Sequence, residues 1–223
     1  MMTYEDALCA SRHGTWESLS FASRLEVLQA VENHAAVRVG RTPRQVEGRW
    51  LHDGPDGVVL GEYDPADNRI HINNSQLMPN ARYGKQSDDL LDTVLHEGRH
   101  AYQHQVVRGE VHHPDAEEVK AWAENMKSGN YVQFSQNPRA YWQQPIEADA
   151  RAYASERLEE LKREREALDQ AESARAESAG AESARDVFER QVSTHGTATG
   201  GLERQAVSEG VSRAVRVQGR SQR

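Results

Sequence analysis

The chain has 223 residues, of which 37% are hydrophobic and 28% are charged, and its formal net charge at pH 7 is −8. That length accommodates one domain of ordinary size plus an appendage, and the mean hydropathy of −0.85 indicates that part of the chain buries little. The acidic balance and the lack of a basic face argue against a nucleic-acid partner. No apolar run is long enough to span a bilayer, so we expect no membrane partner.

The single cysteine, Cys9, excludes an internal disulfide bond and is compatible with a reducing cytosol. Residues 1–15 lack the charged start and the apolar segment of a secretory signal peptide. We therefore expect the protein to be cytoplasmic, or to be exported by a route that does not use a signal peptide.

The upstream part of the chain predicts a helix followed by a hairpin. Apolar residues at imperfect helical spacing predict an amphipathic helix over residues 19–37. Residues 57–63 and 69–73 are predicted strands, separated by the turn-rich loop 64–68. His71 alternates with two isoleucines, so we expect it on the opposite face of the sheet as a structural residue rather than a ligand.

A predicted helix over residues 87–107 comes next. Ser87 is a plausible N-cap, and Asp88 and Asp89 place negative charge in the first turn, where the helix dipole favours it. Apolar residues follow at helical spacing and no proline interrupts them. Gly98 lies inside this helix at a cost of about 1 kcal/mol, which predicts the close approach of another backbone.

This helix carries the most informative motif of the chain, His96-Glu97-Gly98-Arg99-His100. In an H-E-x-x-H run the two imidazoles lie one turn apart on the same helix face, so both can reach one zinc ion at about 2.0–2.1 Å. Glu97 then lies beside the metal, where it can take a proton from zinc-bound water. The alternative is that His96 and His100 are exposed helix histidines without a ligand role.

A third protein ligand is expected on a later helix, because catalytic zinc usually has three protein ligands and one open position. Pro145 can open such a helix, and Glu147 in its first turn shares a predicted face with alanines that allow close packing. Alternatively, Glu147 interacts only with the helix dipole or with Arg151. Asp149 points elsewhere and is expected to be a partner of a ligand or a solvated charge.

Three further residues have candidate roles near this site. Tyr153 or His104 is expected to stabilise the oxyanion, and Tyr141 is a further candidate for transition-state hydrogen bonding. His104 lies two turns beyond His96 and could instead be a solvated histidine or a partner of a ligand. Tyrosines near alanine-rich helix contacts also serve as packing groups.

The motif segments resemble the zincin metallopeptidases, specifically gluzincin-like proteins in which H-E-x-x-H is followed by a glutamate on a later helix. Residues 147–154 are similar to the E-x-x-A-x-x-[FY]-A segment of small bacterial and phage-associated zincins, including the ImmA/IrrE type. Residues 144–150 also look like zincin-like domains of bacterial toxins and effectors. The resemblance implies Zn²⁺ on His96, His100 and Glu147, and an extended peptide paired with the edge of a small sheet, for which we expect residues 69–73.

The C-terminal part of the chain has a different composition. A charged helix runs into three near-repeats of Ala-Glu-Ser-Ala, whose period of five matches neither a heptad nor a strand. Beyond residue 193 the Gly, Ser, Thr, Gln and Arg content predicts disorder. We therefore expect a domain over residues 1–165, a charged helical extension over 166–192 that offers a surface to a protein partner, and a disordered tail over 193–223.

Together these observations predict an α+β fold in which a small antiparallel sheet packs on the active-site helix. The predicted function is a zinc-dependent metallopeptidase that acts on a protein or peptide substrate. Two alternatives remain open: a toxin or effector protease, and a noncatalytic interaction protein that uses the C-terminal helix.

Overall fold

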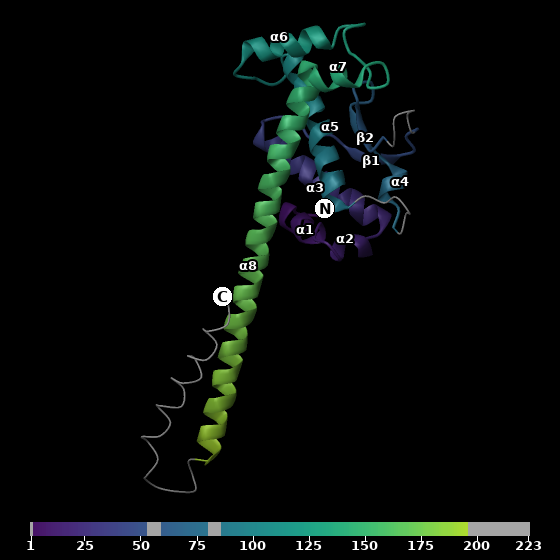
Figure 1. Cartoon of the computed structure of the whole chain (residues 1–223). Coiled ribbons are helices and arrows are strands. Elements are labelled where there is room, and N and C mark those ends of the chain that lie inside the picture. The colour runs from purple at the N-terminus through teal and green to yellow at the C-terminus, as the bar shows by residue number, and fades with distance from the viewer. Residues whose placement is uncertain (1, 53–58, 80–85, 196–223) are drawn as a thin grey trace. The chain divides into compact units, whose positions relative to one another are not determined.

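The computed structural model describes residues 2–52, 59–79 and 86–195, with side chains described as far as residue 179. By its contacts the chain divides into two units, Met1–Asp169 and Gln170–Arg223. The fold is mixed, with helices and one three-stranded sheet (Figure 1). The elements in chain order are α1 (Tyr4–Ala10), α2 (Thr15–Ser18), α3 (Phe21–Arg38), β1 (Val46–Arg49), β2 (Gly61–Asp64), β3 (Arg69–Asn73), α4 (Asn74–Leu77), α5 (Ser87–Val107), α6 (Ala116–Asn125), α7 (Pro138–Gln143) and α8 (Pro145–His195).

The sheet has the strand order β1-β3-β2 and is not the purely antiparallel sheet that was predicted. β2 pairs antiparallel with β3, which confirms the predicted hairpin, but β2 is shorter than the predicted strand 57–63, of which residues 57 and 58 lie outside the described residues. β1 pairs parallel with β3. β1 gave no strand signal because Val46 is the one apolar residue among its four. The assignment of residues 69–73 to an edge strand was therefore wrong: β3 is central, and β2 has a described neighbour on one side only.

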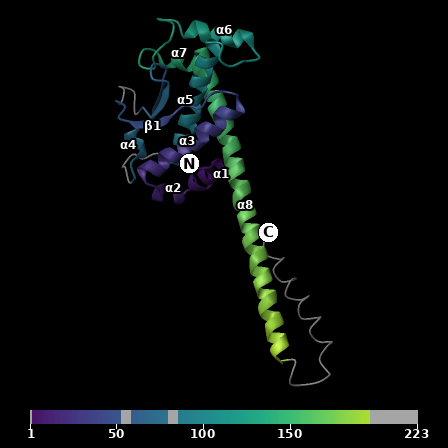
Figure 2. The same cartoon turned by 180° about the vertical axis from the view of Figure 1, so that it is seen from behind.

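The core lies between the sheet and helices α3 and α5. Ile70 and Ile72 on β3 are fully buried, and they belong to one cluster with Leu28 of α3 and with Leu91 and Leu95 of α5. Figure 2, the view from behind, shows α3 and α5 beside the sheet, between β1 and α8. Alternate residues of β3 and the apolar stripe of α5 thus pack against each other. The other face of α5 remains available for polar groups.

The two predicted helices of this core are confirmed, with small shifts at their starts. α3 begins at Phe21, because the Ser20 side chain accepts a hydrogen bond from the Ser23 backbone N–H and so caps it. α5 covers the predicted residues, but its N-cap is Gln86. Ser87 is the first helical residue, and its hydroxyl donates to the Ser11 backbone oxygen at 2.7 Å.

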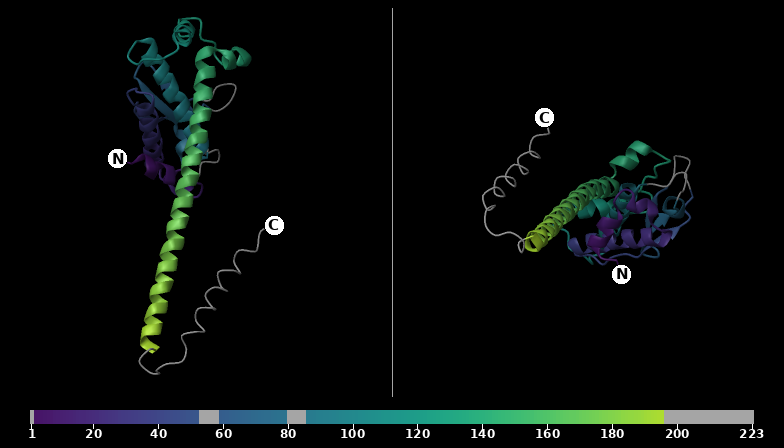
Figure 3. Two further views of the ribbon diagram at one scale, coloured as in Figure 1. Left: turned by 90° about the vertical axis from the view of Figure 1, so that its left-hand side faces the viewer. Right: turned by 90° about the horizontal axis from the view of Figure 1, so that it is seen from below.

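α8 begins at Pro145, as predicted, and continues to His195. As far as Asp169 it runs along the first unit, where Glu164 accepts a hydrogen bond from the Tyr4 hydroxyl and Arg165 pairs with Asp88 (Figure 3). Residues 166–192 lie within α8, and every side chain from Gln170 to Ser178 is exposed. Of the predicted tail, residues 193–195 end α8, and 196–223 lie outside the described residues.

Among the helices of the described residues, none has both the length and the apolar composition that crossing a bilayer requires.

Candidate metal centre

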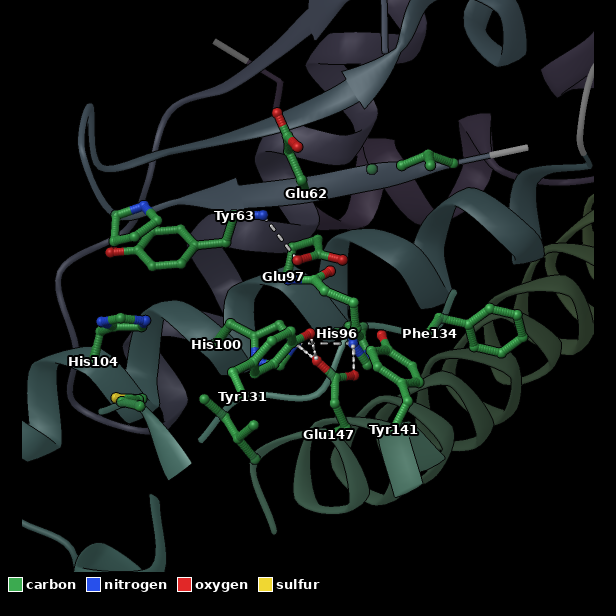
Figure 4. A pocket seen from close by; sticks show the side chains of 16 residues that line it. Glu62, Tyr63, His96, Glu97, His100, His104, Tyr131, Phe134, Tyr141 and Glu147 are labelled. Atoms are coloured by element: carbon green, nitrogen blue, oxygen red, sulfur yellow. Dashed lines mark hydrogen bonds and ion pairs between the residues drawn. The ribbon is translucent and has the colours of Figure 1, made fainter. Parts of the chain in front are cut away.

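Three potential ligands converge where α5 meets the first turn of α8. His96 and His100 lie one turn apart on α5, and their Nε2 atoms are 3.0 Å from each other. Glu147 on α8 faces both rings: its Oε2 is 3.3 Å from Nε2 of His96, and its Oε1 is 3.3 Å from Nε2 of His100. The three side chains point toward one common position in Figure 4, and their ligand atoms all lie within 4.8 Å of one another.

The donor set and the burial of these groups fit a zinc ion. Glu147 is only 1% exposed, and its buried Oε2 makes no hydrogen bond among the described residues; its polar neighbours are Nε2 of His96 at 3.3 Å and Nη1 of Arg151 at 3.7 Å. A buried carboxylate oxygen without a partner is costly, and a cation held between it and the two imidazole nitrogens would satisfy it. Two histidine nitrogens and one glutamate oxygen are a ligand set of catalytic zinc sites.

The charges at this point are strongly coupled. Burial raises the pKa of Glu147, but the hydrogen bonds and positive charges of His100 and His96 outweigh it and hold that pKa well below its usual range. Burial lowers the pKa of His100, yet the opposing interactions with Glu147 and Glu97 raise it to about 9. Without a metal, the ionised Glu147 is thus paired with a protonated His100, and a zinc ion bound at this position would replace that proton.

Glu97 lies beside the ligand group and not in it. Its Oε2 accepts a hydrogen bond of 2.8 Å from the backbone N–H of Tyr63 on β2. This bond fixes the carboxylate next to the two histidines and links α5 to the exposed edge of the sheet. Glu97 thus lines the same cavity as His96, His100 and Glu147.

A cavity of about 630 Å³ opens over the three ligands. One wall is β2, with Gly61 and Tyr63, and the opposite wall comes from the segment between α6 and α8. No lysine or arginine is found among the lining residues that the structure describes. These are Val59, Gly61, Glu62, Tyr63, Pro65, His96, Glu97, His100, His104, Met126, Tyr131, Gln133, Phe134, Tyr141, Ile146 and Glu147.

Two tyrosines reach the ligand group from this second wall. The Tyr131 hydroxyl donates a hydrogen bond of 2.8 Å to Oε1 of Glu147. The ring of Tyr141 is perpendicular to that of Tyr131, with the ring centroids 6.3 Å apart. Burial, followed by the negative charge of Glu147, raises the pKa of both hydroxyls. Both therefore keep their protons and can act as hydrogen-bond donors.

Two buried amide side chains hold the segment that carries Tyr131. Gln144 Oε1 accepts from the Val132 backbone N–H and from Nδ2 of Asn125, both at 3.1 Å. Gln144 Nε2 donates to the Val132 backbone oxygen at 3.0 Å. Because Asn125 ends α6 and Gln144 directly precedes α8, these bonds fix an otherwise irregular stretch next to the ligands.

The structure brings His104 into the cavity but not into the ligand group. Its ring lies 5.4 Å from that of Tyr63, measured between centroids. Burial, followed by the positive charges of Arg108 and His100, lowers the pKa of His104 to about 4. His104 is therefore neutral near pH 7 and lines one end of the cavity.

Tyr153 does not reach the cavity, so the structure does not place this predicted catalytic residue at the site. Its ring packs on the Arg99 guanidinium, 4.9 Å from the ring centroid. The reason is helix geometry: six residues at 3.6 per turn rotate Tyr153 by about 120° away from Glu147. Tyr141, the other tyrosine named from the sequence, does line the cavity, together with Tyr131.

Other predicted features have structural explanations. A Cβ atom at Gly98 would lie 2.6 Å from Nη2 of Arg41 and 2.7 Å from Oε2 of Glu32, so the close neighbour is a buried ion pair and not the expected backbone. His71 lies between Asp67, at 2.9 Å, and Glu47, at 3.4 Å. Those two carboxylates contact opposite nitrogens of its ring, which suits a structural ion-pair cluster.

Sequence reasoning missed Tyr131, because it belongs to no motif and meets Glu147 only through contacts that folding creates. Gln103 belongs to the segment 100–103 that resembles zincin-like toxin domains, but the sequence did not assign it a role as the partner of His100. Comparison with known protein families, with curated proteins and with solved structures gives no match. The functional conclusion must therefore come from the geometry of the site.

Proposed function

We propose that this chain is a zinc-dependent metallopeptidase with a zincin-like active site. The observation that carries the proposal is the convergence of His96, His100 and Glu147, with the Glu97 carboxylate fixed beside them. When bound there, zinc polarises the scissile carbonyl and lowers the pKa of a coordinated water to about 7.

Glu97 is the proposed general base. Its Oε2 accepts from the Tyr63 N–H, which orients the carboxylate, so Oε1 is the proposed proton acceptor. That oxygen takes a proton from the attacking water and later delivers it to the leaving amine. A carboxylate fixed by a backbone amide needs no reorganisation during the two transfers.

The Tyr131 and Tyr141 hydroxyls are the proposed donors to the carbonyl oxygen as it becomes negative. Both keep their protons because burial and Glu147 raise their pKa. Tyr131 donates to Glu147 in the structure, and a small rotation redirects this donor toward an oxygen bound next to Glu147. Hydrogen bonds of this kind stabilise the transition state more than the substrate.

The proposed substrate is an extended peptide that pairs with β2. Gly61 and Tyr63 line the cavity, and among the described strands β2 is paired on one side only. Because the Tyr63 N–H already donates to Glu97, an added strand would pair with the remaining backbone groups of this edge, along the wall opposite Tyr131. Because Glu62 and Glu97 line the cavity without a described lysine or arginine, peptides with neutral or basic side chains should be cleaved in preference to acidic ones.

The direct test is cleavage of an unfolded protein by the purified full chain, followed by mass spectrometry of the fragments. We expect cleavage that a zinc chelator abolishes and that added zinc restores. Cleavage that survives chelator would contradict the proposal, and so would a zinc-loaded chain that cuts none of a broad panel of unfolded proteins.

A further inference from the structure

We propose that Gln103, Asp149 and Arg99 form a network that positions the zinc ligand His100. This inference rests on the proposed function, since it concerns how the chain orients one of the ligands. It assigns a role to Arg99, one of the two variable positions of the H-E-x-x-H motif.

Gln103 makes the contact to the ligand. It lies one turn after His100 on α5, is fully buried, and its Oε1 is 2.9 Å from Nδ1 of His100. The other end of the amide fixes its orientation: Nε2 is 2.9 Å from the backbone oxygen of Ile146 and 2.6 Å from Oδ2 of Asp149. Both of these atoms accept from the amide, so its NH₂ group must face them and its oxygen must face His100.

This orientation determines the tautomer of His100. Because the Gln103 oxygen only accepts, Nδ1 of His100 must carry the hydrogen. In the neutral ring, Nε2 then has the free lone pair, and Nε2 is the atom that faces His96 and Glu147. A histidine that donates from its other nitrogen is oriented and made a stronger metal ligand.

Asp149 and Arg99 hold the amide in place. Arg99 donates to Asp149 through Nε at 2.8 Å and Nη2 at 2.9 Å, a bidentate pair. The guanidinium is enclosed by three aromatic rings at 4.4 to 5.4 Å, those of Tyr102, Tyr153 and Trp122. Arg99 thus neutralises a carboxylate that is needed to orient Gln103, and the rings fix Arg99 itself.

A neutral amide is the side chain that this position requires. A carboxylate at residue 103 would lie against Asp149, where Gln103 now donates at 2.6 Å. An aliphatic side chain would leave three buried polar groups without this partner: Nδ1 of His100, the carboxylate of Asp149 and the backbone oxygen of Ile146.

The test is the zinc affinity of the purified full chain, measured by competition with a chromophoric chelator. Gln103→Leu should bind zinc about 10- to 100-fold more weakly than the wild type, the usual effect of removing a partner of a ligand. The matched control is Gln105→Leu: Gln105 is equally buried on the same helix but bonds to the backbone of Thr42. This control should keep the wild-type affinity.

A spectroscopic measurement separates positioning from folding. The visible bands of a bound cobalt(II) ion should shift in Gln103→Leu and stay unchanged in Gln105→Leu, because only the first change frees the His100 ring. Asp149→Asn keeps the side-chain volume, so it tests the network if Gln103→Leu does not fold. It should lower the zinc affinity less than Gln103→Leu does.

Two outcomes would overturn these conclusions at different levels. The first outcome is that the Gln103 and Gln105 variants have equal zinc affinity and identical cobalt spectra, and that Asp149→Asn has the zinc affinity of the wild type. It would overturn the positioning network and leave the metallopeptidase proposal intact. A wild-type chain that binds no zinc would overturn the proposed function and the network with it.

Discussion

The helices that carry the candidate ligands and the wall that carries Tyr131 are built in different ways. The ligands lie on regular helices: His96 and His100 are one turn apart on α5, and Glu147 is in the first turn of α8. Tyr131 instead comes from an irregular segment that the Asn125 and Gln144 amides hold in place. In the proposed mechanism, metal binding and stabilisation of the carbonyl oxygen therefore depend on separate parts of the fold, so substitutions should separate them.

The largest expected effect comes from substitutions on α5, the helix that carries His96, Glu97 and His100. Glu97→Gln should keep one zinc per chain and lower kcat by about 10²- to 10⁴-fold, because it removes the proton acceptor and leaves the ligands in place. His96→Ala should lose both zinc and activity. Elemental analysis together with a peptide-cleavage assay checks the pair, and normal turnover by Glu97→Gln would refute the assignment of the base.

The next largest effect should come from the irregular wall. Tyr131→Phe should lower kcat by about 10²-fold while zinc content stays unchanged, because one donor to the carbonyl oxygen is lost. Tyr153→Phe is the matched control: it keeps the ring on Arg99 and lies outside the cavity, so its kcat should equal the wild-type value. If the two variants had the same kcat, Tyr131 would have no role in turnover.

A smaller effect should follow from loosening the segment without touching the site. Gln144→Leu leaves Val132 and Asn125 without their buried amide partner, at a cost of about 1–3 kcal/mol for each unsatisfied group. We expect a kcat loss below that of Tyr131→Phe, with zinc affinity unchanged. Weaker zinc binding in this variant would show that the ligand helices and the Tyr131 segment are not independent.

The smallest effect concerns stability in acid. Because the pKa of His104 is lowered to about 4, the folded chain takes up that proton only near pH 4, whereas the unfolded chain does so near pH 6.5. The unfolded state binds more protons between these values, so stability falls as the pH drops through this window. The melting temperature of His104→Gln should therefore fall less between pH 7 and pH 5 than that of the wild type. An equal fall in both proteins would contradict the lowered pKa.

Features with local causes could be predicted from the sequence. The apolar residues at helical spacing predicted α5, and Pro145 predicted the start of α8. The i, i+4 spacing predicted that His96 and His100 lie on one face of α5. Features set by distant contacts could not be predicted. Val46–Arg49 forms a strand only because β3 is available to it, and Tyr131 meets Glu147 only because of how the segment between α6 and α8 folds.

Gly98 and Tyr153 show two further limits. The sequence indicated that something approaches Gly98 closely, but not that this neighbour is the Glu32–Arg41 ion pair. Tyr153 was a candidate donor, but it lies six residues after Glu147, and rotation along the helix turns its side chain toward Arg99. Spacing therefore predicted that His96, His100 and Glu147 converge, but it did not predict that Tyr131 lies beside them.

The most direct test of the central claim is the metal content of the purified wild-type chain compared with Glu147→Ala. We predict about one zinc per wild-type chain, with a sharp fall in the variant, because Glu147 supplies the third ligand from α8. A wild-type chain that holds no zinc after purification without chelator and takes up none on reconstitution would contradict the account.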